Sequence, residues 1–148
     1  MRSAADAYRP SITAPDGRIY RGIWPQNVRT PHEGPYIVDL AKRVGGIPEV
    51  TLPCGRADVC TNTDVFEVEP VSSWRSGARQ AFSYSGMTGL AANLALFGDA
   101  DYLDIYLRIR DKMPGLTLWR FNHGRWDPVR SRREAILVTR GEAPGQIP

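Results

Sequence analysis

The chain has 148 residues, of which 42% are hydrophobic and 24% are charged, and its formal net charge is +3 at neutral pH. This composition excludes wholesale disorder and a fibrous fold, and the length predicts one compact domain. We find neither an apolar run long enough to cross a bilayer nor the core of a signal peptide, so we expect a cytoplasmic protein without a membrane partner. The mild basic excess is compatible with a polyanionic partner but does not require one.

The cysteine and histidine residues do not have the pattern of a zinc site. Cys54 and Cys60, together with His32 and His123, lack the CxxC or HxxxH spacing that zinc ligands commonly use. We therefore expect two reduced thiols, either of which can be buried as a small hydrophobic residue.

The N-terminal part of the chain predicts an arm followed by a helix. Residues 1–31 are rich in Pro, Gly and Arg and contain one strand-like alternation, GRIYRGIW. From residue 32 the apolar residues recur at helical spacing until Gly45, which is suited to end a helix. We expect an N-terminal arm over residues 1–31 and a single α/β domain over residues 32–140.

Three β-prone segments follow this helix, at residues 47–55, 56–61 and 64–70. If Asn62 and Thr63 form a two-residue turn, residue n of the second strand pairs with residue 125 minus n of the third. That register sets Asp58 opposite Glu67. A longer loop with a one-residue slip is an alternative, because Thr63 tolerates a left-handed conformation poorly.

The rest of the chain predicts further helices and strands in alternation. We expect a helix at 74–89, a strand at 90–98, a helix at 101–113, a hairpin at 116–129, a further strand at 135–139 and a flexible tail at 141–148. This order of elements is typical of an α/β fold.

Polar residues on the third strand and on the next helix form the candidate site. Glu67 and Glu69 are two residues apart on a strand, so their side chains share one face and require a compensating cation. Gln80 and Tyr84 lie one turn apart on the following helix. Taken singly, an acid pair is typical of a solvated strand and a helical tyrosine is typical of the core. Together with Asp58 they indicate a site, because all of them are expected to face one place.

The stretch GRADV…DVFEVEPVSSWRSGARQAFSYSGMTGL resembles the core of the PD-(D/E)xK nuclease superfamily, in the branch related to the RecB-type nuclease domain. That branch has a Gln-x-x-x-Tyr element on the helix after the acidic strand, which corresponds to Gln80 and Tyr84 here. The resemblance covers roughly residues 35–97. It implies an α/β, restriction-endonuclease-like core of helix, three strands, helix and strand, to which this chain adds a C-terminal helix and a β-hairpin.

The resemblance also implies roles for individual residues. Asp58 and Glu67 would hold Mg²⁺ or Mn²⁺, together with a backbone carbonyl such as that of Val68. The metal would lower the pKa of a bound water and offset the charge that develops on the phosphate. Gln80 and Tyr84 would orient the scissile phosphate or the attacking water.

The chain departs from the family pattern at two positions. Ala57 precedes Asp58 where the family has proline, and Glu69 occupies the position of the catalytic lysine. A carboxylate at that position inverts the local charge. Three interpretations remain open: Arg75 or Arg79 supplies the missing cation, Glu69 is itself catalytic as a ligand of a second metal or as a base, or the site is inactive.

We expect a metal-dependent nuclease that hydrolyses phosphodiester bonds of DNA, with Arg75 and Arg79 in contact with the nucleic acid. One alternative is a catalytically inactive nuclease-fold module that binds DNA or a protein partner. Another is a structural or assembly protein in which Glu69 pairs with Arg75 or Arg79. Glu33, at the start of the first helix, is either a further acid of the site or a favourable charge at a helix N-terminus. A homodimer or a larger protein assembly is implied by the resemblance alone.

Overall fold

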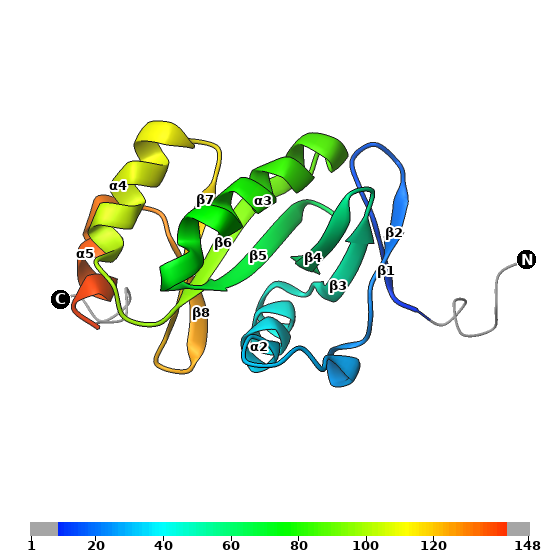
Figure 1. Cartoon of the computed structure of the whole chain (residues 1–148), viewed down its shortest axis with the longest axis horizontal. Helices are drawn as coiled ribbons and strands as arrows, with labels where there is room; N and C mark the ends of the chain where they lie inside the picture. The colour runs from blue at the N-terminus through cyan, green and yellow to red at the C-terminus, as the bar shows by residue number, and fades with distance from the viewer. Residues whose placement is uncertain (1–8, 142–148) are drawn as a thin grey trace, which may run out of the picture.

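The computed structural model describes residues 9–141, which form an α/β fold with one six-stranded mixed sheet and helices on both of its faces (Figure 1). The strand order is β3-β4-β5-β6-β7-β8. The strands are β3 (Ile47–Leu52), β4 (Gly55–Cys60), β5 (Asp64–Pro70), β6 (Ala91–Phe97), β7 (Thr117–Asn122) and β8 (Arg125–Val129). The four α-helices of the described residues are α2 (Gly34–Val44), α3 (Trp74–Thr88), α4 (Tyr102–Lys112) and α5 (Arg132–Thr139). Outside these elements lie the two-stranded sheet of β1 (Ser11–Thr13) and β2 (Ile19–Arg21) and the 3₁₀ turns η1 (Pro25–Asn27) and η2 (Val71–Ser73).

The central strands of the sheet run parallel and the outer strands run antiparallel to their neighbours. β5, β6 and β7 are parallel, so the chain must cross back between them, and α3 and α4 make these two crossings. β3, β4 and β8 join through antiparallel pairs. As a result β4 and β5, which carry the candidate acids, lie side by side, and α3 follows β5 directly.

The two faces of the sheet are covered by different helices. α2 packs on one face, where Ile37 is buried against Phe66 and Val68 of β5. α3, α4 and α5 cover the other face around a second apolar cluster (Figure 1). Since Phe66 and Val68 face α2, the alternate residues Glu67 and Glu69 face α3. The predicted sharing of one face by these two acids is confirmed.

The N-terminal segment carries a small hairpin that packs beside β3. Ile12 of β1 and Tyr20 of β2 are buried in one cluster with Val50 of β3. The N–H of Ile23 donates to the carbonyl of Pro48 at 3.0 Å, which ties the end of this segment to the edge of the main sheet. The strand-like alternation seen in the sequence of this segment corresponds to β2.

The α/β class and most of the predicted elements are confirmed, and the helix ends have the expected causes. α2 ends where Gly45 adopts a left-handed conformation with φ of 68°. α4 is capped at its start by Asp101, whose side chain accepts a hydrogen bond from the N–H of Asp104. Cys54 and Cys60 are free thiols, as predicted.

The predicted strand at residues 135–139 is wrong, because this segment belongs to α5. Its β-branched residues favour a strand, but the preceding residues form a helix start. The Ser131 hydroxyl accepts from the N–H of Glu134 at 3.1 Å, and the Glu134 carboxylate accepts from the N–H of Arg130 at 2.6 Å. Val138 is then buried in the cluster beneath α4. Capping and helical burial together outweigh the intrinsic strand preference.

The described residues end shortly after α5. Gly141 lies in a turn with φ of 75°, and the rest of the expected tail at 141–148 is outside the described residues. None of the helices within residues 9–141 is long and apolar enough to span a bilayer.

Candidate functional site

The hairpin between β4 and β5 has the register that the sequence predicts. Val59 pairs with Phe66, and the N–H of Thr61 donates to the carbonyl of Asp64 at 2.9 Å. The turn therefore contains two residues, and neither of them has a positive φ. The alternative with a longer loop and a one-residue slip is excluded, and the two predicted metal ligands lie opposite each other.

At Asp58 and Glu67, hydrogen bonds from backbone N–H groups to carboxylates replace the backbone-to-backbone hydrogen bonds between β4 and β5. The N–H of Asp58 donates to Glu67 Oε2 at 3.0 Å. The N–H of Val68 donates to Asp58 Oδ2 at 2.8 Å. Each carboxylate is thus fixed by the backbone of the neighbouring strand. We call this part of the sheet, with Asp58 and Glu67 between the two strands, the β4–β5 opening.

Burial favours the protonated forms of both acids, and at Glu67 the charge of Asp58 adds to this effect. Glu67 is only 2% exposed. Burial raises the pKa of Asp58 to about 6, although its bond with the N–H of Val68 acts in the opposite direction. Burial, and then the charge of Asp58, raises the pKa of Glu67 much further. The Glu67 side chain lowers the pKa of Asp58 and the Asp58 side chain raises that of Glu67, which favours one proton shared by the pair.

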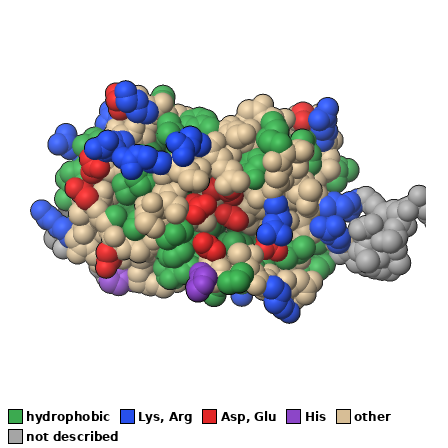
Figure 2. Space-filling view, in the orientation of Figure 1, with side chains coloured by type: hydrophobic (Ala, Val, Ile, Leu, Met, Phe, Trp, Pro, Cys, Tyr) green, Lys and Arg blue, Asp and Glu red, His purple; other side chains and the backbone are tan. Residues whose placement is uncertain are grey.

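Glu69 and Glu33 add negative charge beside this pair. Burial, followed by the charges of Asp58 and Glu33, raises the pKa of the half-buried Glu69 to about 7. α3 approaches Glu69 closely because residue 77 is glycine, where a Cβ would lie 2.6 Å from Glu69 Cγ. Glu33 also raises the pKa of Asp58. In Figure 2 the acidic side chains gather at the middle of this face, between α3 and α2 of Figure 1.

Gln80 and Tyr84 form a hydrogen-bonded pair on the part of α3 that covers β4. Gln80 Nε2 donates to the Tyr84 hydroxyl at 3.1 Å, and this hydroxyl donates to the carbonyl of Arg56 at 3.2 Å. The ring of Tyr84 is buried against Gly55, where a Cβ would collide with the hydroxyl. Burial, and then the charge of Glu67, raises the pKa of Tyr84. The predicted pair is therefore within electrostatic range of the acids.

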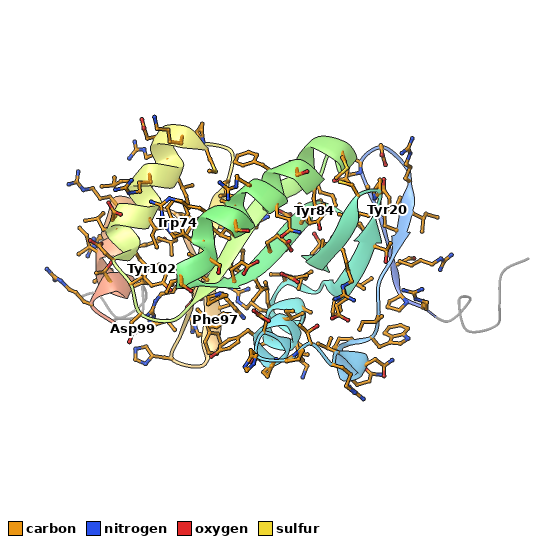
Figure 3. The ribbon with its side chains drawn as sticks, viewed as in Figure 1. Tyr20, Trp74, Tyr84, Phe97, Asp99 and Tyr102 are labelled. Atoms are coloured by element: carbon orange, nitrogen blue, oxygen red, sulfur yellow. The ribbon has the colours of Figure 1, made fainter. Side chains whose placement is uncertain are left out.

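Arg75 and Arg79 lie on the part of α3 that faces α4. The guanidinium of Arg75 is 4.6 Å from the ring centroid of Trp74, and Figure 3 shows Trp74 at the end of α3 near α4, whereas Tyr84 lies near β4. Both arginines line a pocket between the helices, together with Trp74, Arg108, Asp111, Lys112 and Met113. No ion pair in the described part of the chain joins either arginine to Glu69. These arginines belong to a basic surface beside the acids.

Two charged residues near the acids were missed by sequence reasoning, namely Arg56 and Glu49. Arg56 Nη2 lies 3.9 Å from Glu49 Oε1, and the charge of Arg56 lowers the pKa of Asp58. Glu49 is buried in β3 and lies opposite Asp58 in the β3–β4 register. The available signal was Glu49 itself, an acid within the otherwise apolar strand IPEVTL.

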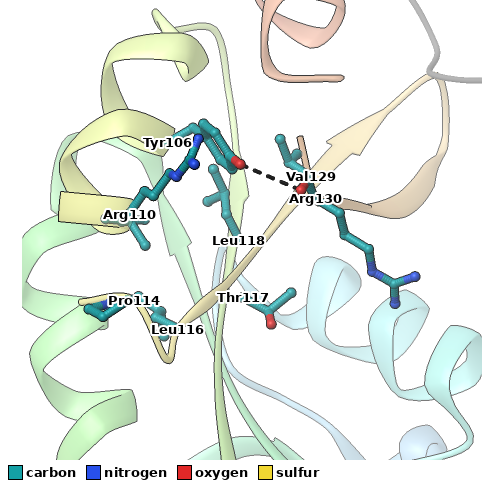
Figure 4. Close-up of a pocket in the computed structure, with 9 residues that line it drawn as sticks. Tyr106, Arg110, Pro114, Leu116, Thr117, Leu118, Val129 and Arg130 are labelled. Atoms are coloured by element: carbon teal, nitrogen blue, oxygen red, sulfur yellow. Dashed lines mark hydrogen bonds between the residues drawn. The ribbon is translucent and has the colours of Figure 1, made fainter. Parts of the chain in front are cut away.

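A separate pocket lies between α4 and the β7–β8 hairpin (Figure 4). Its lining includes the apolar side chains of Ile109, Leu116 and Leu118. The hydroxyl of Tyr106 donates to the carbonyl of Arg130 at 3.4 Å, which links α4 to the end of the hairpin. None of the candidate acids lines this pocket.

The oxygen atoms of Asp58 and Glu67 are suited to a hard divalent cation such as Mg²⁺ or Mn²⁺. Within residues 9–141, no three His, Cys, Asp or Glu side chains are already arranged to enclose a metal ion. Asp58 and Glu67 are the residues of this site that could hold such an ion. No family model, curated protein sequence or solved structure matches the chain.

Proposed function

We propose that this protein is a metal-dependent nuclease that hydrolyses phosphodiester bonds of DNA. The observation that carries this proposal is the pair of Asp58 and Glu67, each fixed in the β4–β5 opening by a backbone N–H of the neighbouring strand. The order helix, three strands, helix and strand is consistent with the restriction-endonuclease-like core that the motifs resemble. Gln80 and Tyr84 lie on the helix that follows the acidic strand, as in the RecB-like branch.

The donor chemistry of this pair fits Mg²⁺ or Mn²⁺. Mg²⁺ usually binds proteins through one or two carboxylates and keeps water and phosphate oxygens as its other ligands. Asp58 and Glu67 would hold the ion, which would supply an activated water and balance the charge developing on the phosphate. Their raised pKa values are those of carboxyl groups that lack a sufficient counter-charge. A cation would replace the shared proton and remove the repulsion between them.

The residues of α3 are suited to hold a phosphate ester and a water beside the acids. Gln80 is exposed, and its amide is oriented by the Tyr84 hydroxyl. It retains a second N–H donor and a carbonyl acceptor for a phosphate oxygen or a water. Tyr84 is anchored on β4, so the pair is held rigidly over the site. Arg75 and Arg79 extend positive charge along the same helix toward the flanking phosphates of a DNA strand.

A catalytically inactive nuclease-fold module is the second candidate, and the identity of residue 69 favours it. Glu69 occupies the position at which the PD-(D/E)xK nuclease superfamily has lysine. Its pKa of about 7 makes it partly ionised at neutral pH. An ionised carboxylate at this position repels the phosphate that lysine would attract. In this case the same face would bind DNA or a protein partner without hydrolysing it.

Cleavage of labelled DNA in the presence of Mg²⁺ or Mn²⁺ separates the two candidates. We expect metal-dependent cleavage by the wild-type chain, and a loss of at least about 100-fold in Asp58→Ala and Glu67→Ala. Asp16→Ala, which removes an acid from the β1–β2 turn, is the matched control and should cleave as the wild type does. Cleavage that survives both site substitutions contradicts the nuclease proposal, and metal-dependent DNA binding without cleavage supports the inactive module.

A further inference from the structure

We propose that Arg56 supplies the positive charge that lysine provides in the motif this site resembles, by contacting the scissile phosphate, and that Glu49 positions its guanidinium. This inference rests on the proposed nuclease function. The proposed cation lies on β4, whereas the sequence suggested Arg75 or Arg79 on α3.

The backbone of Arg56 is fixed while its charged end is accessible. Its carbonyl accepts the hydrogen bond from the Tyr84 hydroxyl at 3.2 Å, which ties this point of β4 to α3. Its side chain is 63% exposed. Arg56 precedes Asp58 by two residues on the same strand. The guanidinium can therefore meet a ligand in solution without leaving the neighbourhood of the metal-binding acids.

Glu49 forms an ion pair with this guanidinium and is itself held in place. Its side chain is only 10% exposed, and Oε1 lies 3.9 Å from Arg56 Nη2. The Thr30 hydroxyl donates to the same oxygen. Glu49 has a φ of 49°, a left-handed conformation that is unfavourable for a residue with a side chain and is concentrated at functional sites. β3 thus keeps a strained backbone at the position opposite Asp58.

The positions of the arginines distinguish Arg56 from the two candidates on α3. Arg56 lies two residues from Asp58 on β4, and its guanidinium lies 3.9 Å from Glu49 of the neighbouring strand β3. Arg75 instead stacks on Trp74, and Arg79 lies with it in the pocket beside α4. Of the three arginines, only Arg56 lies on a strand that carries one of the proposed metal ligands, so it is the best placed to contact a phosphate bound there.

The role that follows is electrostatic. In hydrolysis the water oxygen forms a bond to phosphorus, the bond from phosphorus to the leaving oxygen breaks, and protons pass between water, solvent and the leaving oxygen. Arg56 takes no part in this proton transfer, because guanidinium stays protonated at any ordinary pH. It would donate hydrogen bonds to a non-bridging phosphate oxygen as negative charge increases there.

Single-turnover cleavage by four variants tests this assignment with Mn²⁺ in excess. Arg56→Gln should lower the rate about 100-fold, while the Kd for the same DNA changes by less than about threefold, since one phosphate contact among several is removed. Arg56→Lys should recover part of the rate. Glu49→Gln should slow cleavage about tenfold in the wild-type background but should have no further effect in the Arg56→Gln background, because a positioning residue acts only through its partner.

The matched control is Arg18→Gln, which removes an exposed arginine that also lies 3.9 Å from an acid, Asp16, in the β1–β2 turn. It should cleave at the wild-type rate. If the wild-type chain cleaves and Arg56→Gln cleaves as fast as this control, the role of Arg56 is wrong while the nuclease function stands. If Glu49→Gln slows the Arg56→Gln chain further, the positioning role of Glu49 is wrong. A wild-type chain without cleavage overturns both proposals together.

Discussion

The neighbouring strands β5 and β6 present opposite chemistry to α3. Glu67 is in register with Leu94, and Glu69 with Leu96. Both leucines are fully buried in the apolar cluster beneath α3 and α4, where removal from water stabilises the fold. Glu67 is almost as deeply buried, but its burial raises its pKa and opposes folding. β6 therefore stabilises the domain, whereas β5 carries acids that folding alone does not require.

The largest effect is expected on the leucine side of this comparison. Leu94→Ala removes a fully buried side chain and should lower the free energy of unfolding by about 2–5 kcal/mol through lost burial and a residual cavity. Urea unfolding of the metal-free chain followed by circular dichroism measures this change. A loss below about 1 kcal/mol would show that the region beneath α3 is loosely packed, and the contrast with β5 would disappear.

Replacing the buried acid of β5 should instead raise the free energy of unfolding. Glu67→Gln keeps the shape of the protonated side chain and retains an oxygen that can accept from the N–H of Asp58. It removes the cost of holding a proton on residue 67, so the metal-free chain should become more stable by at least about 1 kcal/mol at pH 7.5. The gain should vanish near pH 4, where the unfolded chain is protonated as well. A destabilised variant at pH 7.5 would contradict the contrast between the strands.

A smaller effect is expected in the pH dependence of the free energy of unfolding, which reports how far burial disfavours the charged acids. Folding raises the pKa of Asp58 from 3.8 to about 6 and that of Glu69 from 4.5 to about 7. The folded state therefore binds more protons than the unfolded state between these values, and stability falls as the pH rises from about 4 to about 7.

Melting curves of the metal-free wild type and of Asp58→Asn isolate this contribution. The difference in melting temperature between the two proteins should move in favour of the variant by a few degrees as the pH rises over that interval. Titrating groups that do not interact with Asp58 act equally on both proteins and cancel in the difference, whereas the responses of Glu67 and Glu69 to the charge of Asp58 are part of the measured effect. A difference that is constant with pH would mean that Asp58 titrates in the folded chain as it does in the unfolded one.

Much of the fold was predictable because local patterns and tertiary packing agree. The helical recurrence that includes Ile37 and the cap at Gly45 define α2, and both are observed. The turn after Thr61 fixes the β4–β5 register, since hairpin geometry converts a turn length directly into cross-strand partners. Residues 135–139 were assigned wrongly because their β-branched side chains favour a strand, whereas a cap at Ser131 determines the helix.

The candidate site was predictable only where one hairpin determines it. The closeness of Asp58 and Glu67 follows from the turn between their strands. The position of Glu49 depends on a different strand pair and on a left-handed backbone that no periodicity signals. Arg56 becomes a candidate only because the structure places its guanidinium beside Glu49. The placement of Arg75 depends on its contact with Trp74, which helical spacing alone does not determine.

Calorimetric titration of the wild-type chain with Mn²⁺ at pH 7, in two buffers with different ionisation heats, tests most directly whether the acid pair is a metal site. We expect one bound ion and release of about one proton per ion, as the cation displaces the proton shared by Asp58 and Glu67. Glu67→Gln should release none and bind far more weakly. Absence of Mn²⁺ binding, or equal binding by the variant, would contradict the account.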